Sequence, residues 1–293
     1  MKILALDIGG TEVKYGYFGK SKTEYGKFSV IDSDGEERLP QNIMKFIKLF
    51  DVDHIGICSP GPFDFKTGTG LMEHKLKSLY KVSLKEMIDT QYSGINTVFI
   101  HDSTAFVLGA IYNKPELKSK NFSGVMLGTG LGYSNTVCGK VMVSETETPL
   151  YTLWNSRYKD GIAEEYVSAT AIKNRAKKLG YSYDNVLSIA IDARNGDKKL
   201  QNLFFEVGSD MGEILNQRQK TDGFESIVIG GQVSLSWDLM KYGFESASEI
   251  PYHIVENPTT CAVDGIKYCI INGKENIYKK AVQNEKDISY NCG

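Results

Sequence analysis

The chain has 293 residues, of which 41% are hydrophobic and 24% are charged, and its formal net charge at pH 7 is -2. One domain usually has roughly 100 to 200 residues, so this length predicts two domains that each bury a core. The composition is that of a globular protein and excludes the disordered, collagen-like and coiled-coil classes. The near-neutral charge, without a run of Lys and Arg, argues against nucleic acid as a partner.

Cysteines and apolar segments indicate the environment in which the chain works. The five cysteines have no CxxC spacing and predict buried thiols rather than metal ligands. Asp7 interrupts the first apolar run too early for a signal peptide, and no segment approaches the roughly 18 apolar residues of a membrane span. We therefore expect a cytoplasmic protein with no membrane partner.

The first hundred residues predict a sheet with an antiparallel edge. Strands are expected at residues 3–6, 13–17 and 25–31, where apolar residues form a run or alternate with polar ones. Helices are expected at 42–50 and 83–89, and buried strands at 54–58 and 97–100. Hairpins followed by helix–strand units are typical of an α/β sheet whose edge is antiparallel.

The strand and glycine turn at the start of the chain recur in the second half. Residues 3–6 lead into Gly9-Gly10-Thr11, and residues 125–127 lead into Gly128-Thr129-Gly130. Such a duplication predicts two similar lobes whose glycine turns face each other across a cleft. Helices at 161–179 and 200–217, and a strand at 226–229 that ends in Gly230-Gly231, are expected to complete the second half.

Both glycine turns suit phosphate groups. Gly lets the backbone approach an anion without a Cβ in the way, and successive N–H groups and a Thr hydroxyl donate hydrogen bonds to phosphate oxygens. A simple hairpin turn is the alternative for each of them alone. Asp7 precedes the first turn, and a carboxylate beside a phosphate needs a cation between them, which indicates Mg²⁺ held directly or through water. Turn capping is the alternative role of Asp7.

Five motifs occur in a fixed order along the chain. They are Asp7–Lys14 (DIGGTEVK), Ser59–Asp64 (SPGPFD), His101–Ala105 (HDSTA), Gly128–Gly132 (GTGLG) and Ile229–Ser234 (IGGQVS). Together they resemble the ROK family, which groups bacterial sugar kinases with sugar-sensing repressors, from residue 1 to about residue 265. The resemblance implies a two-lobed, actin-like (ribonuclease H-like) α/β fold with a central cleft. It also implies an N-terminal lobe at 1–110, completed by a helix near 275–290, and a larger C-terminal lobe at 111–275.

The resemblance implies ATP-dependent phosphorylation of a sugar hydroxyl, with ATP and Mg²⁺ as cofactors and Asp102 as the general base. Residues expected at the phosphates of ATP are Asp7, Gly9, Gly10, Thr11, Lys14, Gly128, Thr129 and Gly130, and those near the adenosine are Gly230 and Gly231. Phosphoryl transfer needs positioning, charge neutralisation and a carboxylate that accepts the hydroxyl proton. The alternative role of Asp102 is to cap a helix that begins near Ser103.

The expected sugar ligands are Gly61, His101, Asp102, Glu145 and Glu164. His101 stands where relatives have Asn, which predicts a changed sugar preference, although a satisfied buried His is the alternative. Glu145, with Glu147 as the alternative, stands in for the family's other sugar-binding glutamate, and exposed polarity at a strand edge explains both residues equally well. Glu164 aligns with a glutamate that binds sugar hydroxyls. If the register is shifted by one residue, Glu165 takes the place of Glu164. The alternative for both glutamates is a solvated charge in the first turn of a helix.

Relatives carry a zinc loop after the second turn, but residues 139–162 here contain no His and no Cys, so no structural zinc is expected. The sequence does not identify the sugar, which is a hexose, an N-acetylhexosamine or a glucoside. Members of the family most often phosphorylate the hydroxyl at the 6-position. A homodimer is suggested by the resemblance alone.

Three function classes follow from these motifs. A sugar kinase is favoured because both phosphate turns and Asp102 are present. A transcriptional regulator is disfavoured, since only six residues precede Asp7 and leave no room for a DNA-binding domain. A non-catalytic sugar-binding protein is the third class, and it is motivated by His101, Tyr133 and the missing zinc loop.

Overall fold

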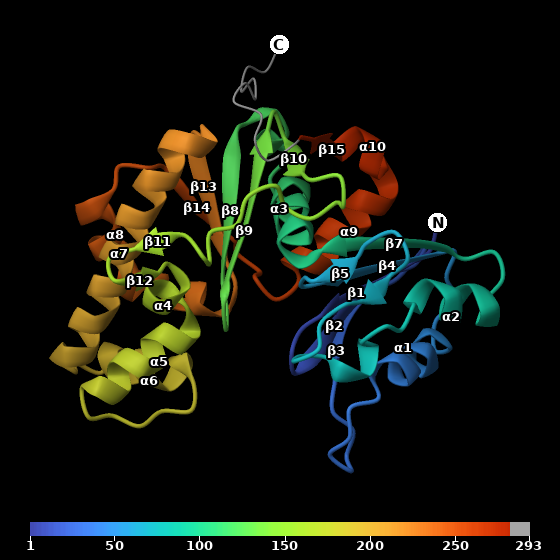
Figure 1. Ribbon diagram of the computed structural model, residues 1–293, viewed down its shortest axis with the longest axis horizontal. Helices are drawn as coiled ribbons and strands as arrows, with labels where there is room; N and C mark the ends of the chain where they lie inside the picture. The colour runs from blue at the N-terminus through green and yellow to red at the C-terminus, as the bar shows by residue number, and fades with distance from the viewer. Residues whose placement is uncertain (282–293) are drawn as a thin grey trace. The chain divides into compact units, whose positions relative to one another are not determined.

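The computed structural model describes residues 1–281, which form two compact α/β units (Figure 1). Unit 1 comprises Met1–Lys118, Lys140–Leu150 and the described chain from Thr259 onward, and unit 2 comprises Ser119–Gly139 and Tyr151–Pro258. These units differ from the division expected at residue 110, because two later segments return to unit 1. Of the helix expected near 275–290, the described part is α10 (Lys274–Ile277) followed by β15 (Tyr278–Lys280), and the remainder lies outside the described residues.

Unit 1 is built on a five-stranded sheet with the order β3-β2-β1-β4-β7. Its strands are β1 (Ile3–Ile8), β2 (Glu12–Phe18), β3 (Thr23–Ser29), β4 (His54–Ser59) and β7 (Asn96–His101). The first three strands pair in an antiparallel manner, and β1, β4 and β7 pair in parallel. The expected mixed sheet with an antiparallel edge is confirmed.

One face of this sheet packs against α1 (Leu39–Ile47) and α2 (Leu84–Gln91) (Figure 1). Alternate residues of β1, such as Leu4 and Leu6, are fully buried there. Helix α1 begins earlier than expected because Pro40 occupies its first turn, where proline is tolerated. Helix α2 begins as expected at Ser83, whose hydroxyl accepts a hydrogen bond from the N–H of Glu86 at 3.2 Å.

The opposite face is covered by α9 (Cys261–Asn272), which packs in turn on α3 (Asp102–Asn113). The two helices meet backbone to backbone. A Cβ added to Gly109 of α3 would lie 1.8 Å from the Cys261 carbonyl oxygen, and one added to Gly265 of α9 would lie 1.8 Å from that of Ala105. This close approach explains why the chain after Thr259 belongs to unit 1, although it is far from α3 in sequence.

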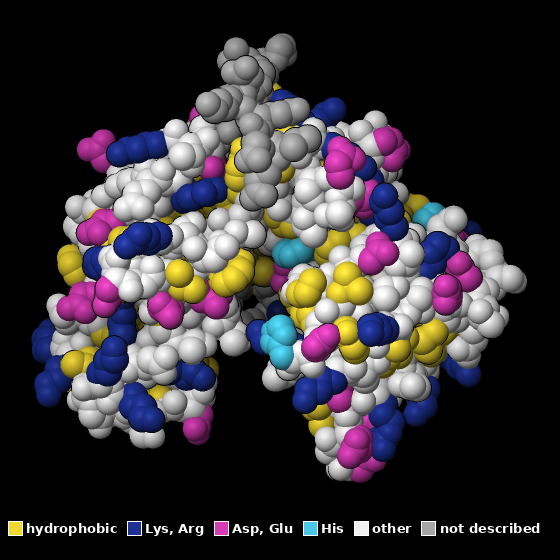
Figure 2. Space-filling model, viewed as in Figure 1, with side chains coloured by type: hydrophobic (Ala, Val, Ile, Leu, Met, Phe, Trp, Pro, Cys, Tyr) yellow, Lys and Arg dark blue, Asp and Glu magenta, His cyan; other side chains and the backbone are white. Residues whose placement is uncertain are grey.

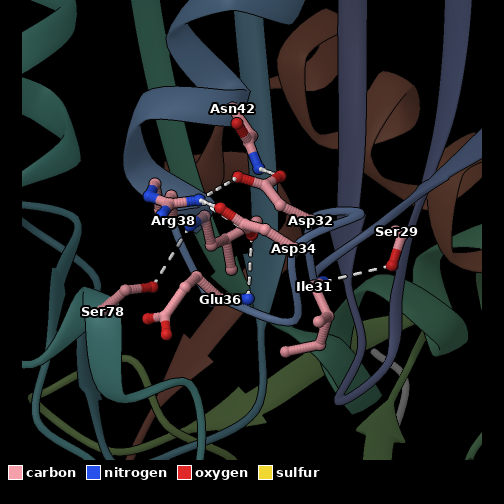
Figure 3. A network of polar contacts seen from close by, with 9 residues as sticks. Ser29, Ile31, Asp32, Asp34, Glu36, Arg38, Asn42 and Ser78 are labelled. Carbon is pink, nitrogen blue, oxygen red and sulfur yellow. Dashed lines mark hydrogen bonds and ion pairs between the residues drawn. The ribbon is translucent and has the colours of Figure 1, made fainter.

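Short elements complete unit 1. They are β5 (Phe63–Asp64), β6 (Thr69–Gly70), η1 (Lys77–Leu79), η2 (Pro115–Ser119), which reaches the unit boundary, and β10 (Lys140–Val143), which pairs in parallel with β15. The connection between β3 and α1 is held by Arg38, which forms ion pairs with Asp32 and Asp34 (Figure 3). Asn42 of α1 donates a hydrogen bond to Asp32 at 2.5 Å and so joins this network to the helix.

Within unit 2 the strands follow the order β14-β13-β8-β9. They are β8 (Phe122–Leu127), β9 (Leu131–Val137), β13 (Ser226–Gly230) and β14 (Tyr252–Ile254). Strands β8 and β9 form an antiparallel hairpin, as β1 and β2 do, whereas β13 pairs in parallel with both β8 and β14. Each unit therefore contains the strand–glycine-turn–strand element that the sequence predicts.

The helices of unit 2 include α7 (Lys198–Asp222) and α8 (Trp237–Ala247), which pack together. The remaining elements are β11 (Arg157–Tyr158), β12 (Gly161–Ile162), α4 (Glu164–Val167), α5 (Ala169–Lys178), α6 (Val186–Arg194) and η3 (Gln232–Ser236). The helical stretch expected at 161–179 is divided into α4 and α5. Ser168 has an extended backbone and caps α5 by accepting a hydrogen bond from the Ala171 N–H at 3.1 Å, which separates α5 from α4.

Charged side chains of both signs are mixed over the face of the described residues shown in Figure 2. This mixture agrees with the formal net charge of -2. Among residues 1–281, no helix combines the length and the hydrophobicity that crossing a lipid bilayer requires.

Replacing Gly109 by Ala tests the close contact of α3 and α9. Gly to Ala in a helix interior normally stabilises by about 0.5–1 kcal/mol, but here the methyl group collides with the Cys261 carbonyl. We expect the opposite sign, a loss of about 2 kcal/mol or more in the free energy of unfolding. Urea denaturation measures it, and a stabilised Gly109→Ala variant would contradict the contact.

Candidate active site

The carboxyl ends of the parallel strands of unit 1 bring the predicted catalytic residues to one edge. Asp7 of β1 is paired in register with Cys58 of β4, and Cys58 is paired with Ile100 of β7. The chain continues from Ile100 through His101 into α3, whose first residue is Asp102. Ligands of α/β proteins commonly bind at such carboxyl edges.

Asp7 is a poorly solvated carboxylate. Its side chain is 16% exposed, its Oδ1 accepts a hydrogen bond from the Cys58 thiol at 3.2 Å, and Lys14 Nζ lies 3.9 Å from its Oδ2. Burial raises the pKa of Asp7, and the negative charge of Asp102 adds to this, while Lys14 and Cys58 act in the opposite direction. The site would accommodate a cation that compensates this charge.

Asp102 has the opposite electrostatic balance. Burial acts to raise the pKa of Asp102, but His101 and the Ser103 N–H outweigh it, and the pKa lies below its ordinary value. Asp102 Oδ1 accepts a hydrogen bond from the Ser103 N–H at 2.6 Å and lies 2.8 Å from His101 Nδ1. Both of these contacts are made by Oδ1, and the side chain is 22% exposed. Asp102 is thus an ionised carboxylate that is oriented through Oδ1 and partly exposed.

The first glycine turn joins β1 to β2 next to Asp7. Its closing hydrogen bond runs from the Gly9 N–H to the Glu12 carbonyl at 3.0 Å. Gly10 and Thr11 are exposed, and a Cβ added to Gly10 would have no heavy atom of another residue within 4 Å. The backbone at Gly10 is therefore open to an anion, beside the carboxylate and the ammonium group of Lys14.

The second turn joins β8 to β9 in unit 2 and is supported by α4 and α5. The Gly128 carbonyl accepts a hydrogen bond from the Ala169 N–H at 2.9 Å, and the Thr129 carbonyl accepts one from the Thr170 hydroxyl at 3.0 Å. The first residue of α4, Glu164, accepts a hydrogen bond from the Leu131 N–H at 2.8 Å through Oε2. The structure thus places Glu164 on the predicted phosphate turn of unit 2.

Gly230 and Gly231 lie at the same end of the unit 2 sheet as the second turn. Gly230 is paired in register with Met126, at the end of β8. Gly231 has a φ of 84°, and a Cβ there would lie 2.3 Å from the Leu127 carbonyl oxygen, so only Gly fits. The predicted adenosine turn and the second phosphate turn are therefore neighbours.

Sequence reasoning missed apolar side chains near this end of unit 2. Leu235 in η3 is 56% exposed, and Leu187 and Ile191 in α6 are 61% and 46% exposed. Helix α6 packs against η3, and Arg194 of α6 donates a hydrogen bond to the Leu235 carbonyl at 3.0 Å. These side chains offer an apolar surface on elements that adjoin the Gly231 turn.

The predicted sugar ligands are not all gathered in one place. Gly61 and His101 lie together, since a Cβ added to Gly61 would be 3.6 Å from His101 Nε2. Glu145 is exposed in a turn of unit 1, whereas Glu147 forms ion pairs with Lys274 and Lys280. These partners, which are distant in the sequence, give Glu147 a structural role, whereas Glu145 is exposed.

Among residues 1–281, no cluster of three or more His, Cys, Asp and Glu side chains is arranged to hold a metal ion. Mg²⁺ requires no such cluster, because it keeps several waters and is commonly bound by one or two carboxylates and the phosphates of a substrate. Asp7, with its buried charge next to the Gly10 turn, fits that requirement.

Replacing Asp7 by Asn tests the electrostatic cost of the site. The pKa of folded Asp7 lies above its ordinary value of about 3.9. The folded protein therefore loses stability as the pH rises from the ordinary pKa to the raised one. Asp7→Asn removes the buried charge and should raise the melting temperature at about pH 8, with a smaller difference at about pH 4.5. Thermal unfolding at both pH values measures this. An exposed control, Asp89→Asn, should change little, and a destabilised Asp7→Asn at pH 8 would contradict the account.

The first half of the chain is similar in sequence to known proteins. Residues 3–144 match the model of the ROK family. A β-glucoside kinase of Klebsiella pneumoniae is 27% identical over 135 residues, which are 45% of this chain and 45% of that protein. A β-glucoside kinase of Listeria innocua is also 27% identical, over 138 residues with the same coverage. The matched region therefore spans less than half the length of these relatives.

Solved structures match nearly the whole chain. A ROK family glucokinase from Streptomyces griseus, in complex with glucose and AMPPNP, has a TM-score of 0.74 at 20% identity and covers 91% of this chain and 98% of its own. A ROK family transcriptional regulator, a homologue of the E. coli MLC protein, has a TM-score of 0.73 at 16% identity. The match covers 91% of this chain and 77% of that protein. The expected actin-like α/β fold is confirmed, and residues 3–144 are similar to the ROK family.

Proposed function

We propose that this protein transfers the γ-phosphoryl group of ATP to a sugar hydroxyl, with Asp102 as the general base. The observation that carries this proposal is the geometry of Asp102. Its Oδ1 is held by the Ser103 N–H and lies 2.8 Å from His101 Nδ1, and its side chain is 22% exposed. A fixed, ionised carboxylate that is partly exposed is what a general base requires.

The two units have different parts in this proposal. Unit 1 supplies Asp102, the neighbouring Gly61 and His101, and the Asp7 turn, which are assigned to the sugar and to Mg²⁺. Unit 2 supplies the Gly128–Gly130 turn for the phosphates, and the Gly231 turn with its adjoining apolar side chains for the adenosine. The expected arrangement of the two glycine turns across a cleft stays a prediction.

The proposed transfer is balanced in protons and electron pairs. The sugar oxygen bonds to the γ-phosphorus, its proton passes to Asp102, and the bond from that phosphorus to the bridging oxygen breaks with its electrons on ADP. Asp7 would hold Mg²⁺ directly or through water, and bound Mg²⁺ supplies charge neutralisation at the phosphates. Backbone N–H groups of the two turns would orient those phosphates.

The substrate class follows from the relatives and remains a proposal. The matched relatives are β-glucoside kinases, and a structural neighbour is a glucokinase with bound glucose. We therefore assign this chain a hexose, an N-acetylhexosamine or a glucoside, phosphorylated at the 6-position. Glu164 is less suited to the sugar than the alignment implied, because its carboxylate accepts a hydrogen bond from the second turn.

A non-catalytic sugar-binding protein is the second candidate. It is favoured by His101, which stands where the family's kinases have Asn, and by the similarity of the fold to that of a ROK regulator. Both candidates bind sugar, and only the kinase releases ADP in a sugar-dependent way.

The variant Asp102→Asn separates the two candidates. It keeps the shape of the side chain and removes the base, so we expect turnover to fall by about 10²- to 10⁴-fold while ATP affinity is retained. Coupled ADP release with D-glucose, N-acetyl-D-glucosamine and methyl β-D-glucoside measures turnover, with Asp89→Asn as the matched exposed control. Equal turnover of Asp102→Asn and wild type would remove Asp102 from the role of base.

Metal analysis of the purified protein tests the zinc prediction. Since residues 139–162 contain neither His nor Cys, we expect no stoichiometric zinc, and prolonged chelation should leave the melting temperature unchanged. One bound equivalent of zinc, or unfolding by a chelator, would show that other residues replace the family's loop.

A further inference from the structure

The N-terminal end of α5 holds two successive carbonyl groups of the second glycine turn. The Gly128 carbonyl accepts a hydrogen bond from the Ala169 N–H at 2.9 Å. The Thr129 carbonyl accepts one from the Thr170 hydroxyl at 3.0 Å. All four residues belong to unit 2. The peptide groups that follow Gly128 and Thr129 are thus oriented by the same end of one helix.

The planarity of these two peptide groups determines where their N–H groups point. In a trans peptide, the C=O and the N–H of the next residue lie in one plane and point in opposite directions. Both peptides are trans. Because the carbonyls of Gly128 and Thr129 are directed toward α5, the N–H groups of Thr129 and Gly130 are directed away from it.

Successive N–H groups that point to one side of a turn form a concave donor site for an anion. The turn is accessible, since Thr129 is exposed and Gly130 is half-buried. The residue after this pair is also held, because the Leu131 N–H donates a hydrogen bond to Glu164 Oε2 at 2.8 Å. The backbone of the turn is therefore fixed before a phosphate group arrives.

We propose that the Thr170 hydroxyl is a positioning group for the nucleotide. It orients the peptide between Thr129 and Gly130 so that the Gly130 N–H, together with the Thr129 N–H, donates to a phosphate oxygen. The Ala169 N–H holds the preceding peptide independently, so loss of the hydroxyl would release one N–H group and leave the rest of the turn in place. The inference rests on the proposed role of this turn in binding the phosphates of ATP.

The stability of α5 does not depend on the Thr170 hydroxyl. Ser168 caps the helix by accepting a hydrogen bond from the Ala171 N–H at 3.1 Å, and Thr170 is exposed in the first turn. If the hydroxyl had only a structural role, its loss would lower the melting temperature and leave the KM for ATP unchanged. The positioning role predicts a change in the KM for ATP instead.

The variant Thr170→Val keeps the shape of the side chain and removes the hydroxyl. We expect the KM for ATP to rise about 3- to 10-fold, as for one lost hydrogen bond, with kcat and the sugar KM within about 2-fold of wild type. Thr170→Ser keeps the hydroxyl, and all three constants should stay within about 2-fold of wild type. Steady-state ADP release measures them, with the sugar of highest turnover among D-glucose, N-acetyl-D-glucosamine and methyl β-D-glucoside.

Thr221→Val is the matched control in unit 2. The Thr221 hydroxyl is exposed and donates a hydrogen bond to the Arg218 carbonyl at 2.9 Å, at the C-terminal end of α7. This end of α7 leads to Glu225, whose N–H bonds to the Asn121 carbonyl just before β8, whereas the turn follows the other end of β8. Its KM for ATP should equal that of wild type.

Thermal unfolding of each variant provides a readout of folding. The proposal is overturned if the KM for ATP of Thr170→Val stays within about 2-fold of wild type. It is equally overturned if Thr170→Ser shows the same rise as Thr170→Val, or if the rise follows the melting temperature in all three variants.

Failure of the kinase function gives a different result from failure of this inference. Calorimetric titration with Mg²⁺ and a non-hydrolysable ATP analogue measures nucleotide binding without turnover. If wild type binds the analogue but releases no sugar-dependent ADP, the kinase function fails and the inference is judged by binding alone. Weaker binding by Thr170→Val that is restored in Thr170→Ser would support it. Equal binding by the two variants, or no binding by wild type, would overturn it.

Discussion

The parallel register of β1, β4 and β7 is the constraint on which the candidate site of unit 1 depends. Because these strands end at one edge, Asp7 and Cys58 are neighbours, and the chain beyond Ile100 delivers Asp102 to the same edge. A shift of one residue in any of these strands would turn its side chains to the other face of the sheet. The register is fixed from both sides, by the apolar core against α1 and α2 and by the close contact of α9.

The two carboxylates at this edge have environments that shift their pKa values in opposite directions. Burial dominates at Asp7 and raises its pKa, whereas His101 and the Ser103 N–H outweigh burial at Asp102 and lower its pKa. Opposed environments of two nearby carboxylates commonly accompany a division of roles. In the proposed reaction, Asp7 holds the cation that its charge requires, and Asp102 remains ionised to accept a proton. The energetic cost at Asp7 is one that a bound cation would remove.

The sequence predicted the elements whose signals are local. Short apolar runs predicted the five strands of the unit 1 sheet to within two residues at each end, and the Gly-Thr motifs predicted both turns. The sequence did not predict contacts between residues that are far apart along the chain. Helix α9 has buried residues on several sides and no clear polar face, so its place against Gly109 could not be predicted. Likewise, Glu164 binds the Leu131 N–H and Glu147 binds Lys274, partners that no local pattern shows. The cap at Ser168 was a local signal that was overlooked.

A crystal structure of the protein with its best sugar, Mg²⁺ and a non-hydrolysable ATP analogue tests the central claim most directly. The account predicts that the acceptor hydroxyl lies about 2.6–3.2 Å from Asp102 Oδ2, with Oδ1 still bonded to His101 and the Ser103 N–H. It also predicts the metal ion next to Asp7 and the nucleotide on the Gly128 and Gly231 turns. A sugar bound with every hydroxyl out of reach of Asp102 would contradict the assignment of Asp102 as the base.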